Sequence, residues 1–154
     1  MLGLLLPGLV MLAGSTAAVS AQPMRWRPFS IPQTGMSVDI PAVFSETAGR
    51  PAVYGEKFKT ADGRASLTVE SGPNTHHDSP ASFLAKQDPP PHIRYKRVTP
   101  RFFAVSSYKG DDVWYNRCNI SARFVNCVLI NYPRAAEHDW DDIVTHISLS
   151  LKGD

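Results

Sequence analysis

The sequence has little excess charge of either sign. Its 16 Lys and Arg residues against 14 Asp and Glu residues leave a formal net charge of +2, which excludes a strongly acidic or basic tail-like protein. It has no internal repeat and no low-complexity stretch, and 43% of its residues are hydrophobic, so general disorder is excluded as well. At 154 residues the chain has the length of one domain.

The first 21 residues contain no charged residue. The apolar run Leu4–Leu12 is followed by small residues and then by Val19-Ser20-Ala21, which a signal peptidase accepts. We predict a signal peptide over residues 1–21 and a periplasmic or secreted location. The alternative is a membrane anchor, but it needs about 20 unbroken apolar residues, and Pro7 and Gly14 interrupt the run. No cysteine lies near the cleavage site, which excludes a lipoprotein anchor.

The rest of the chain carries the signals of strands and two helices. Residues 22–35 hold three prolines in ten positions, which predicts an extended arm. Asp62-Gly63 between two alternating runs indicates a hairpin, and Ser79-Pro80 provides the start of a short helix. Apolar residues from Ala136 to Leu151 have helical spacing. We expect strands over 36–40, 52–60, 65–71, 93–98, 102–108, 113–121 and 124–132, and helices over 80–87 and 136–151, in a single domain spanning 36–152.

Strands outnumber helices in this pattern, and most of them are neighbours in the sequence. Such strands pair in antiparallel hairpins, and helices pack on the sheet that they form. The expected fold class is therefore α+β: an antiparallel sheet of about six or seven strands, with the short helix and the long C-terminal helix packed on it.

Two segments carry a resemblance to a known family. Gly35–Pro41 alternates apolar and polar side chains between a glycine and a proline, and Trp140–Leu151 is an apolar-faced helix that ends in Ile147-Ser148-Leu149-Ser150-Leu151. With the order of the elements between them, they resemble the opening strand and the closing helix of the Mog1/PsbP-like α/β/α sandwich superfamily. The resemblance implies an assembly or binding protein rather than an enzyme. It assigns no functional residue, because the superfamily has no common site.

The two cysteines lie on the last two predicted strands. If Ala122-Arg123 forms a two-residue turn, Ser121 lies opposite Phe124. Counting outward then places Cys118 opposite Cys127, in a pair whose Cα atoms approach to about 4.5 Å, within the range of a disulfide. Because an oxidising compartment keeps paired cysteines bridged, we predict a structural disulfide. Buried free thiols and a redox-active pair are the alternatives, and there is no Cys-x-x-Cys motif to support the second.

Residues that commonly carry chemistry are scattered. His76-His77-Asp78 is the obvious metal candidate, but adjacent histidines in a strand point apart, and zinc takes three or four ligands at set spacings. The sequence has no Gly-x-Ser-x-Gly motif and no glycine-rich phosphate loop. We therefore expect no metal, no cofactor and no catalytic residues. The enzyme alternative is a small periplasmic hydrolase whose His77, Asp78 and Ser79 are brought together by the fold.

A basic cluster contains Arg94, Lys96, Arg97 and Arg101, with aromatic residues between them. Such a cluster can bind single-stranded nucleic acid or an anionic surface. In a strand, however, alternation places Arg94 and Lys96 on one face and Arg97 on the other. Basic residues also guard sheet edges against pairing. Since an exported protein meets little nucleic acid, we interpret the cluster as an edge guard and expect no nucleic acid partner.

A polar patch lies on the last predicted hairpin. In the register given above, one face carries Tyr115, Arg117, Asn119 and Asn126, while the cysteines face the other side. An arginine offers a planar fork to a carboxylate or a peptide, so this face is the candidate binding surface. The alternative is an ordinary sheet surface that faces solvent.

The leading hypothesis is an exported, non-catalytic binding or assembly-accessory domain. Its expected partner is a protein or peptide in the cell envelope, and no transmembrane segment remains once the leader is cleaved. The hypothesis rests on the leader, the outline of an α/β sandwich and the lack of a catalytic motif. A membrane-tethered envelope protein is a third class, which an intact leader in the mature protein would reveal.

Overall fold

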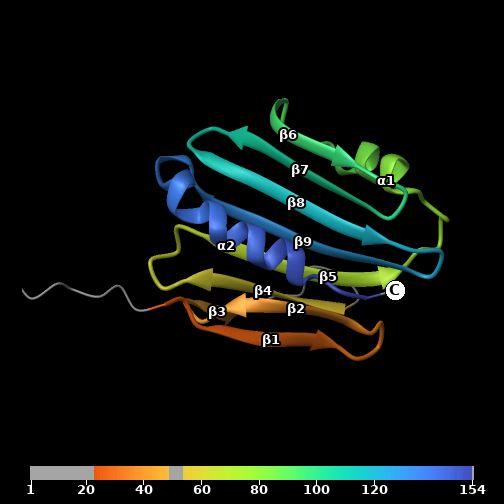
Figure 1. Cartoon of the computed structure of the whole chain (residues 1–154), viewed down its shortest axis with the longest axis horizontal. Coiled ribbons are helices and arrows are strands. Elements are labelled where there is room, and N and C mark those ends of the chain that lie inside the picture. Colours follow the sequence, from red (N-terminus) through yellow and green to blue (C-terminus); the bar gives the residue numbers. More distant parts are fainter. Residues whose placement is uncertain (1–22, 49–53, 154) are drawn as a thin grey trace, which may run out of the picture.

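The computed structural model describes residues 23–48 and 54–153 (Figure 1). The predicted leader, residues 1–21, lies outside the described residues. The described part contains a seven-stranded sheet, a two-stranded sheet, two α-helices and one short 3-10 helix. The strands are β1 (Trp26–Ile31), β2 (Met36–Pro41), β3 (Phe44–Thr47), β4 (Tyr54–Thr60), β5 (Ser66–Pro73), β6 (His92–Val98), β7 (Phe102–Lys109), β8 (Asp112–Ile120) and β9 (Phe124–Pro133), and the helices are α1 (Pro80–Gln87), η1 (Arg134–Ala136) and α2 (Glu137–Ser150).

The seven-stranded sheet has the order β3-β4-β5-β9-β8-β7-β6, and each strand is antiparallel to its neighbours. The turn between β4 and β5 is the predicted one: Asp62 accepts hydrogen bonds from Thr60 and from the backbone N–H of Arg64, and Gly63 has the positive φ that this turn requires. Strands β6 to β9 pair with their sequence neighbours in antiparallel hairpins, as predicted, and β9 pairs with β5 in the middle of the sheet (Figure 1). The predicted α+β class is confirmed.

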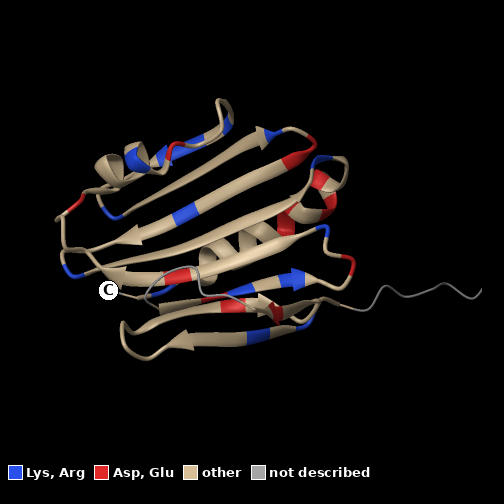
Figure 2. Cartoon of the chain, turned by 180° about the vertical axis from the view of Figure 1, so that it is seen from behind, with Lys and Arg blue, Asp and Glu red and all other residues tan. Residues whose placement is uncertain are grey.

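The two helices lie on opposite faces of the sheet (Figure 1 and, from behind, Figure 2). Helix α2 covers the face with the larger core, where Ile147 packs with Leu67 and Ile130. Helix α1 lies on the other face, where Leu84 packs with Phe103 and with the buried cysteines. The layers are therefore helix, sheet and helix.

Helix α2 is held by an apolar stripe and by aromatic contacts. Val144 and Ile147 are buried on its sheet side. Trp140 stacks on Tyr132 with 5.2 Å between the ring centroids and meets Phe44 edge-on at 5.9 Å. All acidic residues of the helix lie in its first half (Figure 2), at the end where the helix dipole favours negative charge.

The predicted proline-rich arm, residues 22–35, contains strand β1. Its described part is extended, and β1 pairs with β2 in an antiparallel hairpin. Ile31 is buried, and Phe29 meets Phe58 edge-on at 5.5 Å. Pro28 is tolerated because β1 is an edge strand, which needs backbone donors on one side only. This segment is therefore one strand of a hairpin packed on the domain rather than a separate arm, and the boundary drawn at residue 36 falls inside that hairpin.

Polar contacts connect this hairpin to α2. The His146 imidazole Nε2 lies 2.8 Å from the Asp39 carboxylate, and its ring stacks on Trp26 with 3.7 Å between centroids. The backbone N–H of Asp39 donates to the Ser150 hydroxyl. Helix and hairpin share one hydrophobic core, so they form a single layer over the sheet.

Helix α1 begins at the predicted residue. The backbone N–H of Ser82 donates to the Ser79 hydroxyl at 3.2 Å, and the backbone N–H of Ser79 donates to the Ser82 hydroxyl at 2.9 Å. Pro80 occupies the first helical position, where its missing N–H costs nothing. These contacts satisfy two donors that a helix start otherwise leaves without partners.

The predicted disulfide is confirmed by the register of β8 and β9. Cys118 lies opposite Cys127, the two sulfur atoms are bonded, and the Cα atoms are 4.1 Å apart. Both residues are buried against α1. The register also places Asn119 opposite Asn126, as the turn at Ala122-Arg123 predicts.

Strand β3 is not predicted from the sequence. Only Phe44 of its four residues is buried, so the strand is too short for an alternating pattern to show. It pairs with β4 and forms one edge of the sheet.

Replacing both cysteines by alanine is expected to lower the free energy of unfolding by about 2.5–3 kcal/mol. The bridge closes a loop whose ends are nine positions apart, and opening it returns entropy to the unfolded chain. Urea unfolding followed by tryptophan fluorescence measures the loss, and reduction of the natural protein should produce a similar one. Two thiols that alkylate in the native, unreduced protein would contradict the bridge.

The Glu70 carboxyl group makes the stability of the fold depend on pH. Its carboxyl group lies on the same face of the sheet as Cys127 and has no hydrogen bond or ion pair in the part of the chain that the structure describes. Burial raises the pKa of Glu70 above its usual value, and the charge of Lys57 offsets part of this effect. At neutral pH the charged Glu70 carboxylate therefore lowers the free energy of unfolding, because it is less stable in the folded protein than in the unfolded chain. At a pH where Glu70 is protonated in both states, this destabilisation is absent.

Glu70→Gln is accordingly expected to raise the thermal unfolding midpoint at pH 7 and to leave it nearly unchanged at pH 3. Differential scanning calorimetry at the two pH values measures both midpoints. An equal gain at both values, or a loss at pH 7, would show that the carboxylate carries no such penalty.

Candidate functional site

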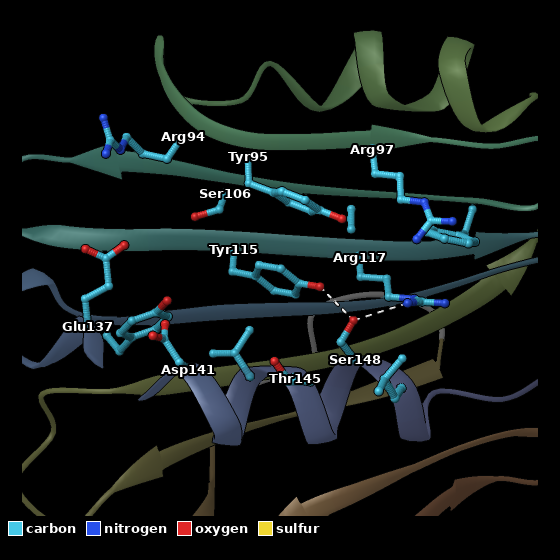
Figure 3. A pocket seen from close by; sticks show the side chains of 15 residues that line it. Arg94, Tyr95, Arg97, Ser106, Tyr115, Arg117, Glu137, Asp141, Thr145 and Ser148 are labelled. Atoms are coloured by element: carbon cyan, nitrogen blue, oxygen red, sulfur yellow. Dashed lines mark hydrogen bonds between the residues drawn. The ribbon is translucent and has the colours of Figure 1, made fainter. Parts of the chain in front are cut away.

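A groove of about 540 Å³ lies between α2 and strands β6, β7 and β8 (Figure 3). Helix α2 packs against β9 and β2, so it leaves the neighbouring strands on this face of the sheet uncovered. We call this depression the α2 groove. It is lined by Arg94, Tyr95 and Arg97 of β6, Phe102, Ala104 and Ser106 of β7, Tyr115 and Arg117 of β8, Tyr132 of β9, and Glu137, Asp141, Val144, Thr145, Ser148 and Leu149 of α2.

Ser148 joins the helix wall of the groove to its floor. Its hydroxyl lies 2.7 Å from the Tyr115 hydroxyl and accepts a hydrogen bond from Nη1 of Arg117 at 3.3 Å (Figure 3). Nε of Arg117 donates to Oδ1 of Asn119 at 3.2 Å, and Asn119 donates to the carbonyl of Leu151 at 3.1 Å. These contacts fix the Arg117 side chain in one position between β8 and the end of α2.

Two arginines share one aromatic ring at this end of the groove. The guanidinium carbon of Arg117 lies 4.1 Å from the centroid of the Phe102 ring, and that of Arg97 lies 5.4 Å from it. In the described part of the chain, neither guanidinium has a carboxylate oxygen within 4.0 Å. The stacking stabilises both cations but does not neutralise them.

Burial changes the acidity of the polar groups on the groove floor. It lowers the pKa of the Arg117 guanidinium; the Tyr115 and Tyr95 hydroxyls act in the opposite direction, and the charge of Arg97 adds to the lowering. Burial raises the pKa of the Tyr115 phenol, partly offset by its hydrogen bond with Ser148 and by the Arg117 charge. Tyr115 is therefore a neutral hydrogen-bonding group at neutral pH, beside an arginine whose charge is poorly solvated.

The other end of the groove carries charges of both signs. Glu137 and Asp141 project from the first turns of α2 (Figure 3). The Tyr108 hydroxyl donates to Glu137 at 2.9 Å, and the Arg94 guanidinium lies over the Tyr108 ring at 5.1 Å from its centroid. The end of the groove near Phe102 therefore carries positive charge from Arg97 and Arg117, whereas the end near Tyr108 carries Arg94 together with the carboxylates of Glu137 and Asp141.

The four residues predicted as a binding patch have different surroundings. Tyr115 and Arg117 line the α2 groove, and Asn119 lines an adjoining depression of about 490 Å³ beside Arg117. Asn126 is fully buried and accepts a hydrogen bond from the Ser71 hydroxyl. The patch thus does not form an open sheet surface, because the C-terminal half of α2 lies over part of it.

The alternation expected along β6 is interrupted. The register of β6 against β7 shifts between Ile93 and Tyr95, so Arg94 lines the groove together with Tyr95 and Arg97. Lys96 lines a small apolar pocket on the side of α1 instead. The prediction that Arg94 shares a face with Lys96 is wrong, because a β-bulge moves Arg94 to the opposite face.

Phe102 and Ser148 are site residues that are not predicted from the sequence, and Arg97, which is interpreted there as part of an edge guard, lines the groove as well. Ser148 does have a signal in the sequence, because it lies four positions after Val144 on the apolar stripe of the C-terminal helix. A hydroxyl at that position faces the core and needs a partner there. The identity of that partner depends on how the helix crosses the sheet.

The His76-His77-Asp78 segment precedes α1, and Ser79 is the N-cap of that helix. The Asp78 carboxylate is paired with the Lys86 ammonium group at 2.7 Å. The hydrogen bonds that it accepts from Lys86 and from the Ser82 hydroxyl lower the pKa of the Asp78 carboxyl. The Ser79 hydroxyl caps the helix. His77 is exposed and makes no side-chain hydrogen bond to described residues. Hydrogen bonds therefore do not join His77, Asp78 and Ser79 into one group.

The described ranges contain no cluster of three or more His, Cys, Asp or Glu side chains arranged to hold a metal ion. They also contain no helix with the length and apolar character needed to cross a membrane.

Solved structures that match this chain include the cyanobacterial PsbP protein (CyanoP) of Synechocystis sp. PCC 6803. The match covers 92% of this chain and 99% of that one, with a TM-score of 0.62 and 9% identity. The Ran-binding protein Mog1p of Saccharomyces cerevisiae also matches, over 85% of this chain and 96% of its own, with a TM-score of 0.57 and 9% identity. The chain has the Mog1/PsbP-like fold.

The resemblance inferred from the opening strand and the closing helix is thereby confirmed for the fold. At 9% identity the likeness concerns the Mog1/PsbP-like fold alone. No protein-family model and no curated protein sequence matches, so the α2 groove has to be interpreted from its own residues.

Ser148→Ala is expected to lower the free energy of unfolding by about 1–2 kcal/mol, because the Tyr115 hydroxyl and Arg117 lose a shared partner in a buried position. Urea unfolding measures the loss. Thr145→Ala is the matched control: Thr145 lies one turn earlier on the groove wall, is exposed and makes no side-chain hydrogen bond to described residues. Equal effects of the two substitutions would show that the Ser148 contacts do not stabilise the fold.

Proposed function

We propose that this protein is an exported, non-catalytic binding or assembly-accessory domain whose α2 groove receives an extended segment of a protein partner. The observation that carries the proposal is Arg117. Its guanidinium is half-buried, held by Ser148 and Asn119, and has no carboxylate partner among the described residues. A partly buried cation without a counter-charge lowers the stability of the free protein. A ligand that supplies the counter-charge removes this unfavourable contribution, and the gain adds to its binding free energy.

The shape and lining of the groove suit a peptide. Its floor includes the small side chains of Ala104 and Ser106 between larger residues, which leaves room for a chain lying on the sheet. Its rim carries Tyr95, which is 49% exposed, and Leu149, which is 72% exposed. Exposed aromatic and apolar side chains beside arginine are typical of the centres of protein interfaces.

Two features support export. Residues 1–21 have the composition of a cleavable leader, and the Cys118–Cys127 bridge is typical of an oxidising compartment. The periplasm or the extracellular space supplies that environment. The fold supports a binding role by analogy, since Mog1p is described as Ran-binding.

The alternative function, a small hydrolase, needs His77 to contact Asp78 and a nucleophile. Asp78 is engaged by Lys86, and the Ser79 hydroxyl by the backbone of α1. No observation favours this alternative over binding.

Site-directed photo-crosslinking in the producing cell tests the proposed function. A benzophenone side chain at Leu149 is expected to crosslink one discrete protein, and the Arg117→Ala substitution should reduce that product severalfold because the partner segment loses its anchor. The same probe at Lys59, which is exposed on the opposite face of the sheet, is the control. Identical products from both positions, or a product that Arg117→Ala leaves unchanged, would contradict binding in the groove.

A further inference from the structure

We infer that the partner segment bound in the α2 groove is dipolar: it places a carboxylate against Arg97 and Arg117 and a positively charged group about three residues away, near Asp141. This inference rests on the proposed function. It adds the chemistry of the occupant and the direction in which its charges lie.

The carboxylate end is defined by two arginines around Phe102. Both guanidinium groups stack on that ring, at 4.1 Å for Arg117 and 5.4 Å for Arg97. Two like charges held beside one ring repel each other, and an anion that contacts both offsets the repulsion. A stacked guanidinium keeps its N–H groups at the ring edge, where a carboxylate can accept two of them in parallel.

Arg117 has N–H donors that make no hydrogen bond to described residues. A guanidinium carries five N–H groups, and the structure uses one for Ser148 and one for Asn119. These two bonds hold the planar group in place, so little side-chain entropy remains to be lost on binding. The other N–H groups make no hydrogen bond to described residues and remain for a ligand.

The groove continues past this end. Phe102 and Arg117 also line the adjoining depression of about 490 Å³, together with Arg101 and Asn119. A chain can therefore pass Arg117 rather than stop there. The carboxylate belongs either to an acidic side chain within the segment or to the C-terminus of the partner, and the two sources share the same chemistry.

The opposite end of the groove disfavours a polyanion. Glu137 and Asp141 lie at that end with Arg94, and all acidic residues of α2 lie in the same half of the helix. A nucleic acid or a phosphorylated polymer that follows the groove would bring its charges against these carboxylates. A segment with a positively charged group at that end is attracted to the Glu137 and Asp141 carboxylates.

The helix sets the distance between the two charges. Asp141 and Ser148 are seven residues apart on α2, which is about 10 Å at 1.5 Å per residue. A peptide in the extended polyproline II conformation advances about 3.1 Å per residue with three residues per turn, so side chains three residues apart lie on the same side. About three residues therefore separate the cation from the carboxylate.

Titration of the ¹⁵N-labelled protein with short capped peptides at low ionic strength tests the inference. The probe is N-acetylated, C-amidated Lys-Ala-Ala-Glu, and the controls replace Glu by Gln or Lys by Gln. NMR shifts of the Arg Nε–Hε groups and of the β7 and β8 amides report binding. We expect the probe to shift Arg97, Phe102 and Arg117, and each control to bind about tenfold more weakly, because each lacks one charge-assisted contact.

Variants separate the site from general charge attraction. Arg97→Ala should weaken binding of the probe peptide. Arg64→Ala, which removes an exposed arginine in the turn between β4 and β5, should leave the affinity for the probe unchanged. Acetylated Lys-Ala-Ala with a free C-terminus distinguishes a terminal carboxylate from a side-chain one: whichever peptide binds more tightly identifies the source.

Three results would overturn the inference. They are equal binding of the probe and its Gln controls, the absence of any shift at the Phe102 end, and tighter binding of inorganic phosphate than of the probe at the same arginines. In each case a crosslink from Leu149 that still depends on Arg117 would leave the proposed function standing. Loss of that dependence would remove the proposed function itself.

Discussion

The pairing of β8 with β9 is the constraint on which the rest of the structure depends. Side chains alternate between the two faces of a strand, so a slip of one residue would exchange every residue of one face for those of the other. With Cys118 opposite Cys127, the apolar partners of α1 lie on one side and Tyr115, Arg117 and Asn119 lie on the other. The disulfide strengthens this register but does not choose it, because the turn at Ala122-Arg123 already produces the same pairing.

The position of α2 converts one face of this hairpin into a site. The helix is anchored over β9 and against β2, where Trp140 packs on Tyr132 and His146 pairs with Asp39. Near its C-terminal end it meets β8 through the hydrogen bonds of Ser148 with Tyr115 and Arg117, and the sheet beyond it is left open as a groove. Acidic residues at the start of the helix, together with Arg97 of β6 and Arg117 of β8 near its end, give that groove its polarity, so the helix provides the wall of the site and its negative end.

Much of the fold is predictable because its signals are local. The Asp62-Gly63 turn, the Ser79 cap and the helical spacing after Ala136 each act within a few residues. The site is only partly predictable, because it depends on contacts between distant elements. Alternation identifies the face that carries Arg117, but the β-bulge that moves Arg94 into the groove is a property of the β6–β7 pairing. The burial of Asn126 similarly depends on Ser71, a residue of a strand that pairs with β9 across the sheet centre.

The most direct test of the account is a two-dimensional NOE spectrum of the folded protein. The register places Cys118 and Cys127 in a pair without backbone hydrogen bonds, where the Hα protons of the two strands face each other. We predict a strong contact between the Hα protons of these two residues, and contacts between the Tyr115 ring and the Ser148 methylene group. A strong contact between the Hα proton of Cys118 and that of Asn126 or Val128 would mean a pairing shifted by one residue and would contradict both the register and the site that depends on it.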